Sequence, residues 1–165
     1  MIVLGVDPGT QVTGYGVVSA TNASQMTLVE CGVIRTTARD ALSVRLREIH
    51  DGIVELLQRH TPDVLSIEDV FYARNVRTTV TLGHARGVVL LAAEQHGARI
   101  HELTPTSIKK SVVGSGAATK EQVQFMLTRL LRLKTAPKPT DASDGVAAAV
   151  AFVMGAHLDA KALRR

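Results

Sequence analysis

The chain has 165 residues, 45% of them hydrophobic and 21% charged, a composition typical of one soluble globular domain, which we place at residues 1–165. Its single cysteine, Cys31, excludes a disulfide framework. With no apolar run near the ~20 residues that span a bilayer and no secretory leader, the expected location is the cytoplasm. The net charge of +4 conceals an asymmetry: residues 70–140 contain eleven basic and three acidic side chains and carry +8, which favours a polyanionic partner, nucleic acid before acidic lipid.

The first third of the chain predicts an antiparallel meander of three strands followed by a helix. Residues 2–7 form a short apolar strand that ends in an acid and a Pro-Gly turn, and the segments 12–20 and 26–36 are rich in Val, Thr and Ile. In residues 41–59 the apolar side chains recur at helical spacing, and Asp40 is placed to cap the start of this helix.

The remainder predicts alternating strands and helices: strand 64–68, helix 75–96, strand 99–103, helix 107–113, glycine-rich hinge 114–118, helix 119–133, loop 134–140 and helix 141–158. A strand that returns after a helix pairs parallel to its predecessor through a right-handed crossover. The predicted fold is therefore α/β, with one mixed five-stranded sheet and helices on both faces.

Four acidic residues are expected to meet at one edge of this sheet. Asp7 and Glu68 each end an apolar strand, and the crossover makes these strands neighbours with level ends, where ligands bind in open α/β sheets. Asp141 and Asp144 are spaced i, i+3 at a helix start and share one face. Clustered carboxylates repel unless a cation lies between them, and hard oxygen donors favour Mg²⁺ or Mn²⁺, which can stabilise an in-line phosphodiester displacement.

Each acid also has a local explanation. Asp7 could cap the turn that follows it, and Glu68 could be a solvated strand end. Asp141 and Asp144 could be the acids that helix N-termini favour. Spacing alone leaves these alternatives open.

Five motifs, taken in order, resemble the RuvC-type Holliday-junction resolvases, which are crossover junction endodeoxyribonucleases. They are Gly5-Val-Asp-Pro-Gly-Thr10 with Gly14-Tyr-Gly16, Ile67-Glu-Asp-Val-Phe71, Leu82-Gly-His-Ala-Arg-Gly87, Lys109-Lys-Ser-Val-Val-Gly114 and Asp141-Ala-Ser-Asp144. Each motif is weak alone, but together they extend over nearly the whole chain. The resemblance implies an RNase H-like fold, a homodimer and Mg²⁺-dependent paired nicking of four-way DNA junctions in recombination and repair. It also implies that a branch-migration motor complex is a partner, while the hard oxygen donors of the four acids predict that Mn²⁺ can substitute for Mg²⁺.

The resemblance also assigns roles to particular residues. The family's metal-binding and catalytic acids fall on Asp7, Glu68, Asp141 and Asp144. Its basic residues near the scissile strand fall on Lys109 and Lys120, and its base-contacting aromatic residue falls on Phe71.

Other residues near these positions are candidate DNA contacts. Phe71 and Tyr72 lie in an irregular segment, where a ring can stack on an unpaired base or instead anchor the loop. Arg74 and Arg77 continue this segment and would meet backbone phosphates. Lys110 adjoins Lys109, although paired lysines are common on protein surfaces.

Lys120 occupies an unusual position for a cation. Thr119-Lys-Glu-Gln122 fits a capping box, which places Lys120 at the positive end of a helix, where a cation is unfavourable by ~0.3–1 kcal/mol. This predicts an anion such as a phosphate close to Lys120, unless its side chain simply extends into solvent.

Gly83 and Gly87 lie four residues apart inside a helix, at a cost of ~1 kcal/mol each relative to alanine. They permit close packing either on the sheet or against a second helix across a two-fold dimer seam.

Three other functions compete with the resolvase hypothesis. The Asp7-Pro-Gly-Thr10 turn resembles the phosphate-binding turn of actin-like ATPases, but 165 residues cannot supply their second domain. A non-catalytic junction-binding scaffold, or an RNase H-like nuclease acting on RNA or other branched substrates, would keep the same fold and basic face.

Overall fold

The computed structural model describes residues 1–69 and 76–162, with side chains described as far as residue 155. Its described strands form one five-stranded mixed sheet of order β3-β2-β1-β4-β5. The strands are β1 (Ile2–Asp7), β2 (Val12–Asn22), β3 (Gln25–Arg35), β4 (Val64–Glu68) and β5 (Arg99–Leu103). The first three are antiparallel, while β4 pairs parallel with both β1 and β5, as the crossover rule predicts.

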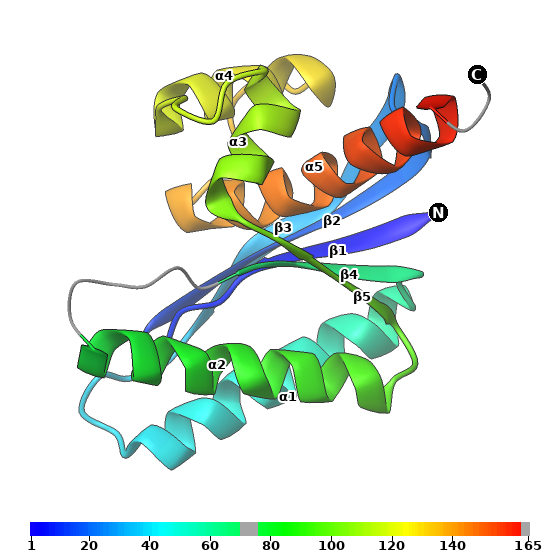
Figure 1. The fold of residues 1–165 in the computed structure, drawn as a ribbon. Coiled ribbons are helices and arrows are strands. Elements are labelled where there is room, and N and C mark those ends of the chain that lie inside the picture. The colour runs from blue at the N-terminus through cyan, green and yellow to red at the C-terminus, as the bar shows by residue number, and fades with distance from the viewer. Residues whose placement is uncertain (70–75, 163–165) are drawn as a thin grey trace.

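Helices cover both faces of the sheet (Figure 1). One face carries α1 (Leu42–His60) and α2 (Val76–Gln95), and the other carries α3 (Pro105–Val113), α4 (Lys120–Leu130) and α5 (Thr140–Ala162). Each face has its own hydrophobic core. Because successive side chains of a strand point to opposite faces, the strands contribute to both cores, with Val3 on the α5 side and Leu4 on the α1 side. None of the described helices is long and apolar enough to cross a membrane.

Helix α5 lies in close contact with the central strands because glycines face it. A Cβ at Gly5 or Gly14 would collide with the backbone oxygen of Gly145 or of Asp141, respectively. In addition, the buried hydroxyl of Ser66 in β4 donates a hydrogen bond of 2.8 Å to the carbonyl of Ala148. These contacts bring the first turns of α5 to the edge of the sheet at which β1 and β4 end.

Several element boundaries differ from the sequence prediction. The residue that caps α1 is Ala41, with no side-chain bond, because the backbone of Asp40 closes a turn onto Thr37 and lies outside the helix, so the predicted cap is wrong. Helix α3 begins earlier than predicted, at Pro105, whose fixed φ suits a first helical position. Helix α4 keeps the predicted capping box but ends at Leu130, since Arg132 adopts a left-handed conformation with φ 54°.

The glycines of α2 do not pack on the sheet. Gly83 and Gly87 are exposed, and a Cβ at either position would meet no atom of the described chain within 4 Å. The interpretation that they allow close helix–sheet packing is therefore wrong.

Candidate active site

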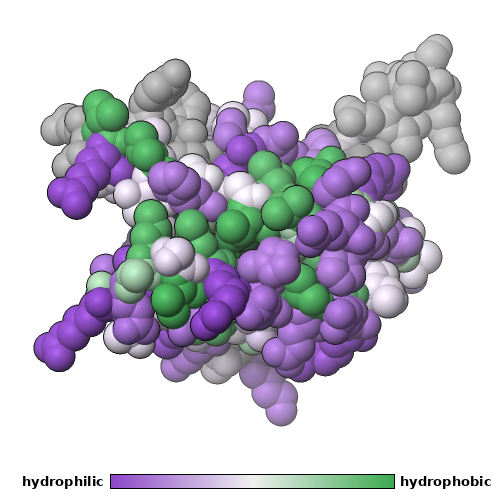
Figure 2. All heavy atoms as spheres, turned by 90° about the horizontal axis from the view of Figure 1, so that it is seen from below, coloured by the Kyte–Doolittle hydropathy of each residue, from purple (hydrophilic) through white to green (hydrophobic). Residues whose placement is uncertain are grey.

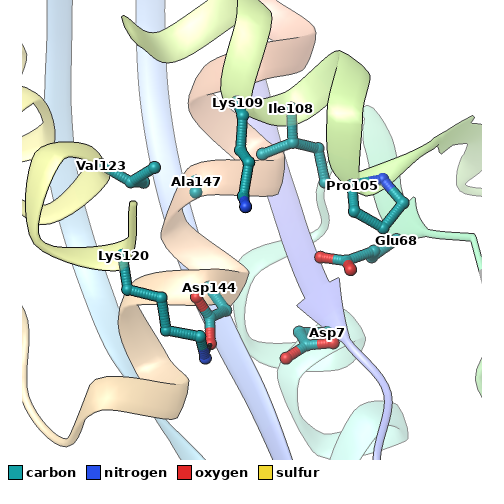
Figure 3. Close-up of a pocket in the computed structure, with 9 residues that line it drawn as sticks. All are labelled: Asp7, Glu68, Pro105, Ile108, Lys109, Lys120, Val123, Asp144 and Ala147. Carbon is teal, nitrogen blue, oxygen red and sulfur yellow. Dashed lines mark hydrogen bonds and ion pairs between the residues drawn. The ribbon is translucent and has the colours of Figure 1, made fainter. Parts of the chain in front are cut away.

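Three acidic side chains from distant parts of the sequence line one pocket. Asp7 ends β1 and Glu68 ends β4, and the register of these parallel strands, with Val6 opposite Ile67, places both acids at the same edge. Asp144 joins them from the start of α5 (Figure 3). The pocket is open, with a volume of about 230 Å³. The predicted convergence at the carboxyl ends of β1 and β4 is therefore confirmed for these three acids.

Two lysines complete the polar lining. Lys109 comes from α3 and Lys120 from the first residue of α4, and both extend towards the carboxylates (Figure 3). The ammonium of Lys120 donates a 2.8 Å hydrogen bond to Oδ2 of Asp144. In this structure the anion beside Lys120 is thus a carboxylate of the protein, which offsets the unfavourable position of the cation at a helix N-terminus. The apolar side chains of Pro105, Ile108, Val123 and Ala147 form the remaining wall.

The pocket holds the carboxylates of Asp7 and Glu68 in an environment that disfavours their charge. Burial raises the pKa of Asp7 to about 6, and the charge of Asp144 raises it further than the charge of Lys120 lowers it. Burial also raises the pKa of Glu68 to about 7, with the charge of Asp7 as the next cause. Bonding to Asp144 in turn raises the pKa of the Lys120 ammonium. The site therefore has more buried negative charge than its lysines balance.

The chemistry of this donor set fits a hard divalent cation. Asp7, Glu68 and Asp144 supply only oxygen ligands, which Mg²⁺ and Mn²⁺ prefer. A cation would offset the burial and the mutual repulsion that raise the pKa values of Asp7 and Glu68. Among the described residues, no three acidic, histidine or cysteine side chains yet converge closely enough to hold a metal ion. The carboxylates would have to draw together around the cation, and Asp144 would have to exchange Lys120 for it.

The fourth predicted acid is placed differently. Asp141 lies in the first turn of α5 and is not part of the pocket lining. Its charge nevertheless acts on the site, because it raises the pKa of both Asp7 and Lys120. The local explanation as a helix-terminal acid therefore stays open for Asp141, whereas Asp144 points into the pocket and is bonded there.

The structure places the other candidate DNA contacts outside the pocket or does not describe them. Lys110 in α3 and Arg77 in α2 are both exposed. Phe71, Tyr72 and Arg74 lie outside the described residues.

Arg86, which no sequence pattern marked as part of the site, contacts the end of β4 from α2. Its guanidinium forms ion pairs with Asp69, at 3.5 Å, and with Glu102 of β5. Asp69 follows Glu68 in the chain, and Glu102 lies opposite Ile67, next to Leu103, which is the β5 partner of Glu68. In the sequence Arg86 is a single basic residue between Gly83 and Gly87 of the predicted helix, and no local pattern marks its distant partners.

The fold and the acidic pocket define the class of protein. A mixed sheet of this order, covered by helices on both faces and carrying carboxylates at the ends of β1 and β4, is RNase H-like and has the donor groups of a nuclease. Comparison with known proteins identifies the family within that class. The family described as "Crossover junction endodeoxyribonuclease RuvC" matches residues 3–152, and the chain belongs to this family.

Individual relatives agree with this assignment over nearly their whole length. The RuvC crossover junction endodeoxyribonuclease of Dictyoglomus thermophilum is 40% identical over 153 residues, which are 93% of this chain and 96% of the relative. The protein of the same name from Pelotomaculum thermopropionicum is 43% identical over 150 residues, 91% of each chain. Among solved structures, "T. thermophilus RuvC in complex with Holliday junction substrate" superposes with a TM-score of 0.91 at 32% identity and covers 96% of both chains.

Proposed function

We propose that this chain resolves four-way (Holliday) DNA junctions by paired, symmetric, metal-dependent nicks during recombination and repair. The observation that carries the proposal is the pocket in which Asp7, Glu68 and Asp144 meet beside Lys109 and Lys120. A similar chain from T. thermophilus has been solved with a Holliday junction substrate. The single cysteine fits action in the cytoplasm.

The acids and the lysines have different roles in this proposal. Asp7, Glu68, Asp144 and, at the margin of the pocket, Asp141 would hold Mg²⁺, for which Mn²⁺ could substitute. When bound, the metal supplies Lewis-acid stabilisation of the attacking and leaving oxygens of the scissile phosphate.

The lysines neutralise the phosphate itself. Lys120 releases Asp144 and pairs with the arriving phosphate. The unfavourable free energy of a cation at the helix N-terminus is then offset by the substrate instead of by a carboxylate of the protein. Lys109 approaches the same pocket from α3.

The basic region at residues 70–140 binds the junction arms in this proposal. Its net charge of +8 favours contacts to phosphates. Phe71 and Tyr72 are proposed to contact bases, and Arg74, Arg77 and Lys110 to contact the backbone.

We propose a homodimer built on the exposed face of α2. Val76, Val80 and Leu91 are 77%, 54% and 52% exposed, and they share the helix face of Gly83 and Gly87. Seen from the side that α1 and α2 cover, apolar side chains gather across the middle of the molecule, with polar side chains around and between them (Figure 2). A two-fold pairing of such faces would present two copies of the pocket to a four-armed substrate. A branch-migration motor complex is a further proposed partner.

The proposal is tested with a synthetic four-way junction and its linear duplex as control. In Mg²⁺ the protein should nick two opposing strands of the junction at symmetry-related positions, and it should leave the duplex intact. EDTA, or the substitution Asp7→Asn, should lower nicking by 10²-fold or more and preserve junction binding, because phosphate contacts elsewhere persist. Junction binding without nicking in Mg²⁺ would identify a scaffold, and preferential cleavage of an RNA strand would identify a different nuclease.

A further inference from the structure

The turn that follows Asp7 is held from the face of the sheet opposite α5. Residues 8–11 connect β1 to β2, and the carbonyl of Thr10 in this turn accepts two hydrogen bonds from the guanidinium of Arg45, 2.6 Å from Nη2 and 3.2 Å from Nε. The hydroxyl of Thr36, one residue beyond β3, donates to the same carbonyl at 2.6 Å. One main-chain oxygen is therefore the meeting point of β3, α1 and the β1–β2 turn.

Arg45 is well suited to fix this oxygen. It lies in the first turn of the 19-residue helix α1, its side chain is part-buried, and its Nε also approaches the Thr36 hydroxyl at 3.2 Å. A guanidinium presents its donors in a rigid planar fork, so two bonds to one carbonyl fix direction as well as distance.

A second pair of hydrogen bonds, between Thr13 and Gly9, holds the same turn. Thr13 in β2 is completely buried, and its hydroxyl donates to the carbonyl of Gly9 at 2.7 Å and accepts from the Gly9 amide at 3.3 Å. With Thr10 fixed by Arg45, the chain that leaves Asp7 is held at two consecutive residues.

The position of Asp7 is set mainly through its backbone. Within the described residues, its carboxylate makes no hydrogen bond or ion pair to another side chain, although it lines the pocket. Its place therefore depends on β1 on one side and on the fixed turn on the other.

We infer that Arg45 is a positioning residue for the nuclease reaction, acting on Asp7 through the carbonyl of Thr10. The inference rests on the proposed role of Asp7. Arg45 does not line the pocket, so its contribution is to the geometry of the acid and not to substrate contact. A displacement of about 1 Å in a reacting group can lower a rate by about 10²-fold.

The test compares Arg45→Gln and Arg45→Lys with Arg47→Gln, an exposed arginine of the same helix. Arg45→Gln should lower the single-turnover rate of junction nicking by about 10–100-fold, per folded molecule, and change the junction Kd by less than about threefold. Arg45→Lys should recover part of the rate because an ammonium can still donate to the carbonyl, though without the fork. Arg47→Gln should match the wild type.

A readout independent of cleavage separates positioning from general stability. Direct Mn²⁺ binding to the DNA-free protein, followed by electron paramagnetic resonance, should weaken several-fold in Arg45→Gln and stay unchanged in Arg47→Gln. Thr36→Val, which removes the other donor to the carbonyl of Thr10, should lower the rate as well. The double variant Arg45→Gln/Thr36→Val should then be less impaired than the product of the two single effects, because both act on one oxygen.

The possible failures can be told apart. If Arg45→Gln lowers the melting temperature but its folded fraction cuts and binds Mn²⁺ like the wild type, Arg45 only stabilises the fold and the inference is overturned. If Asp7→Asn itself cuts and binds Mn²⁺ like the wild type, the proposed function fails, whatever Arg45 does.

Discussion

The raised pKa of Asp7 predicts that this acid destabilises the metal-free protein. Replacing it with asparagine removes a buried charge that lies near Asp144 and keeps the size of the side chain. In EDTA at about pH 8, where the carboxyl is ionised, Asp7→Asn should therefore unfold at a higher temperature than the wild type.

The magnitude follows from the shift. A rise of the pKa from 3.8 to about 6 corresponds, at about 1.4 kcal/mol for each pKa unit, to about 3 kcal/mol of lost stability. The asparagine amide still loses hydration on burial, which costs about 1–2 kcal/mol. The net gain of about 1–2 kcal/mol should raise Tm by about 2–8 °C in a domain of this size.

The sign of the pH dependence is fixed by the direction of the shift. Between pH 3.8 and about 6 the unfolded chain has lost the proton of Asp7 and the folded protein retains it, so the stability of the wild type falls as pH rises. Above about pH 6 the deficit is complete. The advantage of the variant should thus be largest near pH 8 and shrink as the pH falls towards 4.

Thermal melts at several pH values, with and without Mg²⁺, measure this effect. Mg²⁺ should stabilise the wild type more than the variant and narrow or reverse the difference, because metal binding to the folded state adds stability. Glu94→Gln, which neutralises an exposed acid of α2, serves as control and should change Tm little. A gain in Asp7→Asn that is equally large at pH 4, or no gain at pH 8, would refute the reasoning from buried charge.

Four further predictions concern the same machinery. Asp144→Ala should lower the single-turnover rate by 10²-fold or more with a modest change in Tm, and Asp141→Ala should have the smaller effect on rate. If both variants instead lose about 0.5–2 kcal/mol of stability and keep normal rates, the two acids act only at the helix terminus. Lys120→Gln should strengthen Mn²⁺ binding in the absence of DNA, because Asp144 is freed. It should nevertheless lower the cleavage rate more than the junction affinity. Equal losses of rate and affinity would show that Lys120 is only one phosphate contact among several. Arg132→Ala is the matched comparison and should at most weaken junction affinity, which for the wild type should fall steeply with added salt. Gly87→Leu should fold, because the position faces open space, but should sediment as a monomer and lose the paired cuts; a monomer that still cuts both strands in a coupled manner would contradict the dimer.

The local features of the fold were already determined by the sequence. Alternating or continuous apolar residues defined the five strands, and the parallel return of β4 beside β1 followed from the handedness of crossovers. The capping box at Thr119 and Gln122 was readable because its bonds join residues three apart. Likewise, Asp7 and Glu68 could be placed at one edge because strand ends follow directly from strand bounds.

Only the tertiary structure decided how the site is assembled around these acids. The spacing of Asp141 and Asp144 put both on one helix face, but the contact of α5 with Gly5 and Gly14 directs Asp144 into the pocket and leaves Asp141 outside its lining. The partner of Lys120 could not be found from the sequence, since it lies 24 residues away on another helix.

The supporting arginines show the same limit. Arg45 and Arg86 act through a carbonyl and two carboxylates that are distant in sequence, and no local pattern marks such contacts. The open face of Gly83 and Gly87 was equally ambiguous, because helical periodicity gives the spacing of residues on a face but not what that face meets. Hydrogen bonds between neighbouring residues depend on local sequence, whereas the meeting of distant side chains depends on how whole elements pack. For that reason the sequence was enough to place Asp7 and Glu68 at one edge of the sheet, whereas the contacts that complete the pocket depend on the tertiary structure.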